Sequence, residues 1–150
     1  MNLDASLFFA INHLPHVWWS DSFMLMVSGF AAGGILWMCI GAIIVWREET
    51  RDHWFFIPLL SSIASSWILV DYVLKPLIGR ARPALLEGAI LVGHLPGQYS
   101  FPSGHAATAF AAAEIIASKD KRLRIPIFLL AILVCFSRVY LGHHYPTDVI

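Results

Sequence analysis

The residues best suited to chemistry stand near the C-terminal end, in SRVYLGHHYPTD, Ser137 to Asp148. Two adjacent histidines, an arginine and an aspartate gather there in a chain that is otherwise largely apolar. A histidine held by a carboxylate can present its other ring nitrogen as a nucleophile, and a second histidine can protonate a leaving oxygen. These histidines, Asp148 and the more distant His105 are therefore candidate reacting groups.

Cationic side chains that could hold an anion lie in the same half of the chain, at Lys75, Arg82 and Arg138. Guanidinium groups form bidentate, charge-assisted bonds with phosphate, and N–H groups at a helix N-terminus favour an anion. Ser103 is a plausible helix N-cap, and Gly104 is a small residue where the backbone must approach a ligand. Together these residues predict phosphoryl transfer with cationic side chains in place of metal ions.

Composition predicts a membrane protein. Hydrophobic residues make up 58% of the chain and charged residues 13%, and the mean hydropathy is +0.69. The net charge is zero and no basic tract is present, which argues against a nucleic-acid partner. Cys39 and Cys135 lie in apolar runs with no disulfide or zinc spacing. The N-terminus lacks the charge pattern of a signal peptide.

Apolar runs predict an all-α, polytopic transmembrane bundle formed by one domain, residues 1–150. We expect an interfacial segment over 1–22, where Leu3–Trp19 is apolar but interrupted by polar residues, and a transmembrane core over 23–150. The expected spans are Phe23–Trp46, Trp54–Leu74, Gly104–Ala117 and Ile125–Leu141. The first is 24 residues without a charge, which predicts one helix of roughly 36 Å.

The distribution of lysine and arginine predicts the orientation. The linkers Arg47–His53 and Ser118–Arg124 are basic, whereas the N-terminal stretch on the other side has neither residue, so the linkers are expected to be cytoplasmic. Hairpin topology then brings three distant segments to one external face. The residues expected there are Lys75, Arg82, Ser103, His105, Arg138, His144 and Asp148.

Three motifs in this set resemble those of the type 2 phosphatidic acid phosphatase superfamily. KPLIGRARP, Lys75 to Pro83, is similar to its Lys-x6-Arg-Pro motif, and PSGH, Pro102 to His105, is similar to its second motif. Ser137-Arg138 with His144 and Asp148 is similar to the third, Ser-Arg-x5-His-x3-Asp. Three motifs in order, on one expected face, make the resemblance specific from Trp54 to the C-terminus.

The resemblance implies a role for each matching residue. His144 would attack phosphorus to form a phosphohistidine, Asp148 would orient His144, and His105 would be the general acid. The phosphoryl oxygens would be held by Lys75, Arg82, Ser103, Gly104 and Arg138. The family uses no metal or other cofactor. Members continue after the final aspartate with a helix of about 20 residues, so we expect a chain that stops at Ile150 to be truncated and to lack the last helix of the family core.

The implied partners are a lipid phosphate and the surrounding membrane lipids. Family members act on phosphatidic acid, phosphatidylglycerophosphate and undecaprenyl diphosphate, and an external site favours the last two, in a bacterial cytoplasmic membrane. Two alternatives remain: a non-enzymatic membrane protein that grips anionic headgroups, or the same site used for phosphotransfer or vanadate chemistry. The related vanadate haloperoxidases are soluble, which argues against them.

Neighbouring polar residues have simpler interpretations. Asp71 is expected to pair with Lys75 at i, i+4 and to position it. Arg80 is expected to be a solvated or headgroup-facing charge, and His143 a structural or substrate-side neighbour. Glu114 is expected to extend toward the cytoplasmic interface. The remaining histidines, His13, His16, His53 and His94, have no evident partner in the sequence and are expected to be interfacial.

Overall fold

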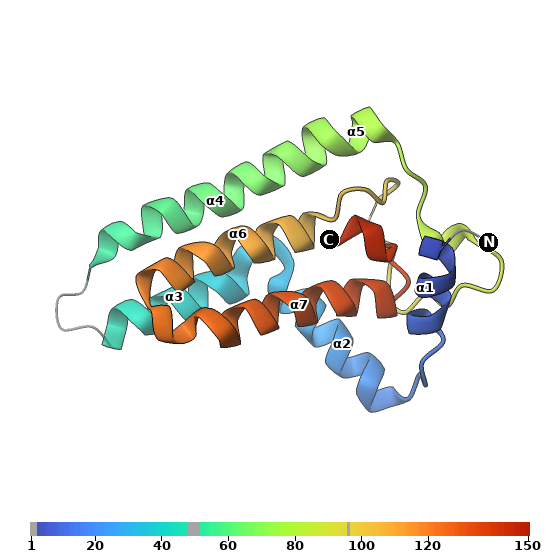
Figure 1. Cartoon of the computed structure of the whole chain (residues 1–150), viewed down its shortest axis with the longest axis horizontal. Coiled ribbons are helices and arrows are strands. Elements are labelled where there is room, and N and C mark those ends of the chain that lie inside the picture. The colour runs from blue at the N-terminus through green and yellow to red at the C-terminus, as the bar shows by residue number, and fades with distance from the viewer. Residues whose placement is uncertain (1–2, 48–51, 96) are drawn as a thin grey trace.

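The computed structural model describes residues 3–47, 52–95 and 97–150, and that part of the chain is helical without a strand. Its helices are α1 Leu3–Asn12, α2 Trp18–Ala31, α3 Ile35–Arg47, α4 Phe56–Ile68, α5 Lys75–Ile78, α6 Gly104–Lys119 and α7 Arg124–Tyr140. Helices α4, α6 and α7 run lengthwise along a bundle that also contains α3, while α2 leaves it at an angle (Figure 1). The predicted all-α class is confirmed.

Within the described residues, three helical segments are long and apolar enough to cross a membrane: Trp18–Arg47, His53–Ile78 and Lys121–Tyr140. Helix α6 has 16 residues, about 24 Å of helix, which is shorter than a hydrocarbon core of about 30 Å. It lies at the centre of the bundle, where Ala109, Ala112 and Ala113 are fully buried. These small side chains let α4 and α7 pack closely against α6.

The prediction of one unbroken helix over Phe23–Trp46 is wrong. Helix α2 ends at Ala31, and a single 3₁₀ turn, Ala32–Gly34, separates it from α3. Gly33 and Gly34 have φ values of +61° and +79°, in the left-handed region that glycine adopts without steric cost. A hydropathy profile does not reveal this break because glycine does not interrupt an apolar run.

We expect Gly34→Ala to destabilise the protein. Its Cβ would stand 2.7 Å from Ile63 Cγ2, and a left-handed backbone costs a residue with a Cβ about 1 to 2 kcal/mol. Gly29 in α2 is the matched control, because a Cβ there meets no atom within 4 Å. Thermal unfolding in detergent should show a lower midpoint for Gly34→Ala only. Equal midpoints for both variants would contradict the proposed strain at this turn.

Helix α1 is shorter than the predicted interfacial stretch, since it ends at Asn12 and α2 already begins at Trp18. Phe8 and Asn12 are fully buried against the rest of the protein. The Asn12 amide donates to the carbonyl oxygens of Ile90 and Tyr140, at 2.8 and 3.0 Å, and accepts from the Ile90 N–H. Helix α1 therefore connects the loop between α5 and α6 with the end of α7 through the hydrogen bonds of Asn12.

Two of the four histidines expected to lack partners have them. His16 Nδ1 lies 2.7 Å from Asp21 Oδ1, and its Nε2 lies 2.8 Å from the Asn12 carbonyl oxygen. His13 Nε2 lies 2.9 Å from the Gly88 carbonyl oxygen. Tertiary contacts between α1, the start of α2 and the α5–α6 loop supply these partners.

The two ends of the bundle differ in what they carry. The end of α5, the start of α6 and the end of α7 lie toward the same end of the molecule as α1, while the α6–α7 connection lies at the opposite end (Figure 1). At that opposite end Lys119 pairs with Asp52 at 2.9 Å, and Glu114 faces Arg124 at 3.7 Å. Glu114 thus points toward the basic connection. Arg51, part of the expected basic linker, is outside the described residues.

Candidate active site

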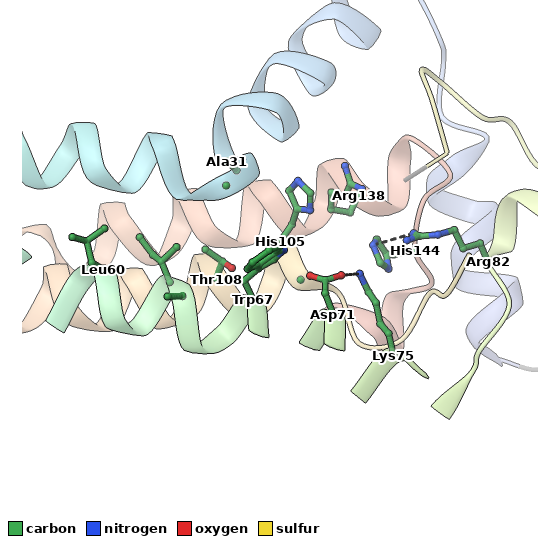
Figure 2. A pocket seen from close by; sticks show the side chains of 14 residues that line it. Ala31, Leu60, Trp67, Asp71, Lys75, Arg82, His105, Thr108, Arg138 and His144 are labelled. Carbon is green, nitrogen blue, oxygen red and sulfur yellow. Dashed lines mark hydrogen bonds and ion pairs between the residues drawn. The ribbon is translucent and has the colours of Figure 1, made fainter. Parts of the chain in front are cut away.

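A pocket of about 500 Å³ opens where α4, α6 and α7 approach the α1 end. Figure 2 shows polar side chains gathered at one end of it and apolar side chains along α4 at the other. The polar lining consists of Asp71, Lys75, Arg82, His105, Thr108, Arg138 and His144, and Gly104 contributes backbone. The structure thus brings together six of the eight predicted site residues; Ser103 and Asp148 are buried beside them.

The start of α6 has the expected form. Ser103 is the N-cap, and its Oγ accepts a hydrogen bond from the Ala106 N–H at 3.4 Å. Its own N–H donates to the Asp148 carbonyl oxygen at 2.9 Å, which joins this helix end to the C-terminal segment. A Cβ on Gly104 would stand 3.1 Å from Asp71 Oδ2, so the small residue allows α6 to approach Asp71.

Arg138 is one of two buried cations of the site within the described residues. It is 3% exposed, and its Nη1 donates to Ser28 Oγ in α2. Its Nε and Nη2 have no hydrogen-bond partner among the described residues. Leaving such donors unmet in a buried position costs about 1 to 3 kcal/mol each. Because the guanidinium lines the pocket, an anion entering the pocket can accept from these donors.

Arg82 approaches His144 from the α5–α6 loop. It is 1% exposed, and its Nε and Nη1 donate to the carbonyl oxygens of Gly97 and His143, at 2.9 and 2.7 Å. Its Nη1 also lies 3.3 Å from His144 Nε2 (Figure 2). This contact holds the ring nitrogen that faces the pocket next to a positive charge.

Lys75 enters the pocket from the end of the second long helical segment. Its Nζ lies 2.5 Å from Asp71 Oδ1, so the predicted i, i+4 pair is confirmed (Figure 2). Asp71 belongs to a π-helical turn, Leu69–Leu74, between α4 and α5. Wider turns of this kind occur often at functional sites. The pair places one carboxylate beside the three cations.

Asp148 lies behind His144. Its side chain is fully buried, and Oδ2 stands 3.6 Å from His144 Nδ1, an ion-pair distance that exceeds a hydrogen bond. Oδ2 also accepts from Ser100 Oγ and from the Tyr145 N–H. Burial acts to raise the pKa of the Asp148 carboxyl, but these neighbours and Arg80 outweigh it, so the pKa lies below its ordinary value.

The pKa of His144 is lowered to about 4. Burial is the main cause, and the charges of Arg138 and Arg82 add to it, while Asp148 acts in the opposite direction. The imidazole is therefore neutral near pH 7. A neutral ring whose Nδ1 faces a carboxylate has its lone pair on Nε2, which lies 3.3 Å from Arg82 Nη1.

The two adjacent histidines have different surroundings. His144 lines the pocket, whereas His143 is buried outside that lining, with neither ring nitrogen hydrogen-bonded within the described residues. Burial lowers the pKa of His143 to about 3. His143 touches the site through its carbonyl oxygen, which accepts from Arg82. The structure thus separates two residues of the same type that are neighbours in the chain.

Arg80 is not the solvated charge that the sequence predicts. Its Nη1 lies 2.5 Å from Asp148 Oδ1 and 2.8 Å from Thr147 Oγ1, and its Nη2 pairs with Asp4 of α1. Ser100 is a second contributor that sequence reasoning misses, since its hydroxyl donates to Asp148. Nothing in the spacing of either residue indicates these contacts, because they depend on how the α5–α6 loop and α1 fold over the C-terminal segment.

Comparison with known proteins identifies the family. The family model of the PAP2 superfamily matches residues 54–150. The chain belongs to the PAP2 superfamily. The match covers the same range as the motif resemblance, and it includes the polar residues of the pocket from Asp71 to His144.

Named PAP2-type relatives are lipid phosphatases. The chain is 28% identical to lipid A 4'-phosphatase of Bacteroides thetaiotaomicron, over 99% of the chain and 70% of that protein. It is 25% identical to undecaprenyl-diphosphatase BcrC of Bacillus subtilis, over 87% of the chain and 66% of that protein. The chain thus spans about two thirds of the length of these curated relatives. It is a member of a family of enzymes that hydrolyse phosphoric esters.

Solved structures agree with the sequence comparisons. The crystal structure of Aquifex aeolicus LpxE matches with a TM-score of 0.79 and 31% identity, over 99% of this chain and 87% of that one. A transmembrane PAP2 type phosphatidylglycerolphosphate phosphatase from Bacillus subtilis matches with a TM-score of 0.73 and 28% identity, over 97% and 75%. The PAP2 fold and membrane character are therefore shared.

Proposed function

We propose that the protein hydrolyses a phosphate or diphosphate group of a membrane lipid through a phosphohistidine on His144. The observation that carries this proposal is the unmatched pair of donors on buried Arg138, at the end of a pocket that also holds Lys75, Arg82 and His144. Three cations around a neutral imidazole form a site that gains stability from an anion with several oxygens.

The proposed reaction has two steps. His144 Nε2 attacks the phosphorus, the bond between phosphorus and the lipid oxygen breaks, and His105 gives its proton to that oxygen. Water then attacks the phosphohistidine, returning a proton to His105 and releasing phosphate. Asp148 keeps the proton on His144 Nδ1. Lys75, Arg82, Arg138 and the N-terminal backbone of α6, at Ser103 and Gly104, hold the phosphoryl oxygens. No step in this scheme uses a metal or another cofactor.

The lining of the pocket supports a lipid substrate. Away from the cations it is formed by Leu60, Ile63, Ala64 and Trp67 of α4, with Ala31 and Gly33 at the break between α2 and α3. A phosphate bound at Arg138 would have its apolar chain run along this part of the pocket. Such a chain fills the apolar part of the pocket and keeps that lining away from water. A soluble phosphate ester has no apolar chain to place there.

The proposed location is the external face of a bacterial cytoplasmic membrane. The basic connection with Lys119 and Arg124 lies at the opposite end of the bundle from the pocket, and basic connections favour the cytoplasm. Undecaprenyl diphosphate, phosphatidylglycerophosphate, phosphatidic acid and lipid A are the candidate substrates, since similar proteins are named for three of them. Each of these lipids carries a phosphate group of the kind that the three cations would hold.

The test is phosphate release by the purified protein in detergent, with each of these four lipids and with a chelator present. We expect release from at least one lipid and no loss with the chelator. Release from none of them would contradict the proposed hydrolysis. Loss of activity with the chelator, restored by added metal, would contradict the metal-free mechanism.

The low pKa of His144 predicts activity in mild acid. His144 must be neutral to attack, so activity is present above its pKa, about 4, and is lost as the pH falls through that value. The lipid phosphate itself titrates near pH 6. In a plot of kcat/KM against pH, the fall caused by protonation of His144 is therefore the one at lower pH. Measured kcat/KM against pH should retain turnover at pH 5.5. A limb at the ordinary histidine pKa of about 6.5, distinct from that of the substrate, would contradict the assignment.

A further inference from the structure

Arg80 joins three parts of the chain behind the pocket. It lies in the α5–α6 loop and contacts Asp4 of α1 and both Thr147 and Asp148 near the C-terminal end of the described chain. Its guanidinium carbon lies 4.1 Å from the centre of the Tyr145 ring. The side chain is 28% exposed and outside the pocket lining. Arg80 therefore touches no group that would contact a substrate.

The contacts of Arg80 determine how the Asp148 carboxylate is oriented. One oxygen, Oδ1, receives the Arg80 Nη1 at 2.5 Å, and the other, Oδ2, is left to Ser100, Tyr145 and the His144 ring. A carboxylate whose two oxygens have different partners cannot rotate without breaking bonds on both sides. Arg80 thus keeps Oδ2 facing His144 Nδ1.

Asp4 in turn holds Arg80. Its Oδ2 pairs with Arg80 Nη2 and accepts from Thr147 Oγ1 at 2.7 Å, and its Oδ1 accepts from the Thr147 N–H at 3.1 Å. Asp4 is more than 140 positions from Asp148 in the chain, and it lies outside the residues that the family model matches. Helix α1 therefore reaches the His144–Asp148 pair both through Arg80 and through Thr147, which precedes Asp148.

We propose that Arg80 is a positioning residue that, held by Asp4 of α1, orients Asp148 against the nucleophilic histidine. This inference rests on the proposed function of His144. It makes the N-terminal helix part of the machinery that prepares His144. It also explains why a polar contact network is built at a site away from the substrate.

The charge of Arg80 also affects the basicity of His144. The charged and titratable groups around that ring, within the described part of the chain, come from several elements. They are Lys75 and Asp71 at the end of the second long helical segment, Arg82 from the loop, Arg138 from α7, His105 from α6, His143 next to it and Asp148 behind it. Arg80 offsets part of the Asp148 charge. Removing that cation leaves Asp148 a stronger partner for an imidazolium, so His144 should protonate at higher pH.

The test compares Arg80→Gln, Arg80→Lys and Asp4→Asn with wild type, using the lipid that wild type hydrolyses. For Arg80→Gln we expect kcat to fall about 10- to 100-fold with little change in KM, as for other residues that orient a reacting group. The acid limb of kcat/KM should move to higher pH. Arg80→Lys keeps the charge and should restore most of kcat and the original limb. Asp4→Asn should fall between them.

Two comparisons separate positioning from general destabilisation. Arg122→Gln is the matched control, because Arg122 is exposed near the α6–α7 connection; it should match wild type. The double variant Asp4→Asn/Arg80→Gln should lose less kcat than the product of the two single losses, because Asp4 acts in part through Arg80. A loss of kcat in the double variant equal to the product of the two single losses would contradict an action of Asp4 through Arg80.

The outcomes distinguish this inference from the proposed function. If wild type is active and Arg80→Gln keeps its kcat and acid limb, the positioning role is overturned while the function stands. If Arg80→Gln fails to fold, the other two variants still test the inference. A kcat and an acid limb of kcat/KM equal to those of wild type in Asp4→Asn would overturn it. A wild type that hydrolyses none of the lipids overturns the proposed function and this inference together.

Discussion

Replacing His144 with alanine is expected to reduce phosphate release at least about 10,000-fold, the scale seen when a covalent nucleophile is removed from an enzyme. The physical reason is that His144 lines the pocket with a lone pair on Nε2, and no other neutral nucleophile among the described lining residues has a carboxylate behind it. The measurement is single-turnover hydrolysis of a labelled lipid, followed by rapid alkaline quenching, which preserves a phosphohistidine. Wild type should carry label on the protein, and His144→Ala should not.

His143→Gln is the matched control for this experiment. His143 is the same residue type in the next position, yet it is outside the pocket lining and contributes only its carbonyl oxygen. We expect it to retain activity within about tenfold of wild type, because a glutamine keeps that carbonyl contact to Arg82. If His143→Gln lost the label and His144→Ala kept it, the assignment of the nucleophile would be wrong.

Arg138→Met should uncouple activity from stability. We expect kcat/KM to fall about 100- to 1,000-fold, since removal of one preorganised donor to a developing charge has this effect. Stability should not fall in parallel, because a buried cation with unmatched donors is replaced by an apolar side chain of similar length. Thermal unfolding in detergent and steady-state kinetics on the same preparations measure the two effects.

Inorganic phosphate gives a second readout for Arg138. A ligand that binds only the folded protein raises its unfolding midpoint, so phosphate should stabilise wild type and have little effect on Arg138→Met. Arg124→Met is the matched control, because Arg124 is exposed at the opposite end of α7. Equal stabilisation of all three proteins by phosphate would show that the anion binds elsewhere.

Much of the site could be predicted because its motifs are local. Ser103 caps α6 and Lys75 pairs with Asp71 through interactions that span three or four positions of one helix. Such spacings are visible in a sequence because helix geometry alone determines which side chains meet. The break at Gly33–Gly34 was missed for the opposite reason, since hydropathy describes burial in lipid and not the backbone angles that glycine permits.

The contacts that could not be predicted join residues far apart in the chain. Arg80 reaches Asp148 and Asp4, and Asn12 binds the backbone of Ile90 and Tyr140. These pairs follow no period, because they arise where irregular loops pack against one another. Their partners become evident only when α1 and the α5–α6 loop are placed over the end of α7.

The amino-acid sequence by itself determined the helical class, the membrane character, the PAP2 motifs and the end of the bundle at which they gather. The length of apolar runs, the distribution of charge, the hairpin connectivity and the spacing of the motifs are sufficient for these conclusions, since each can be read along the chain. Motif spacing also distinguished His144 from His143. Only the tertiary structure decided which donors of Arg138 lack partners among the described residues, and that Arg80 contacts Asp148. Those features depend on distances of a few ångströms between separate segments, and packing alone determines such distances.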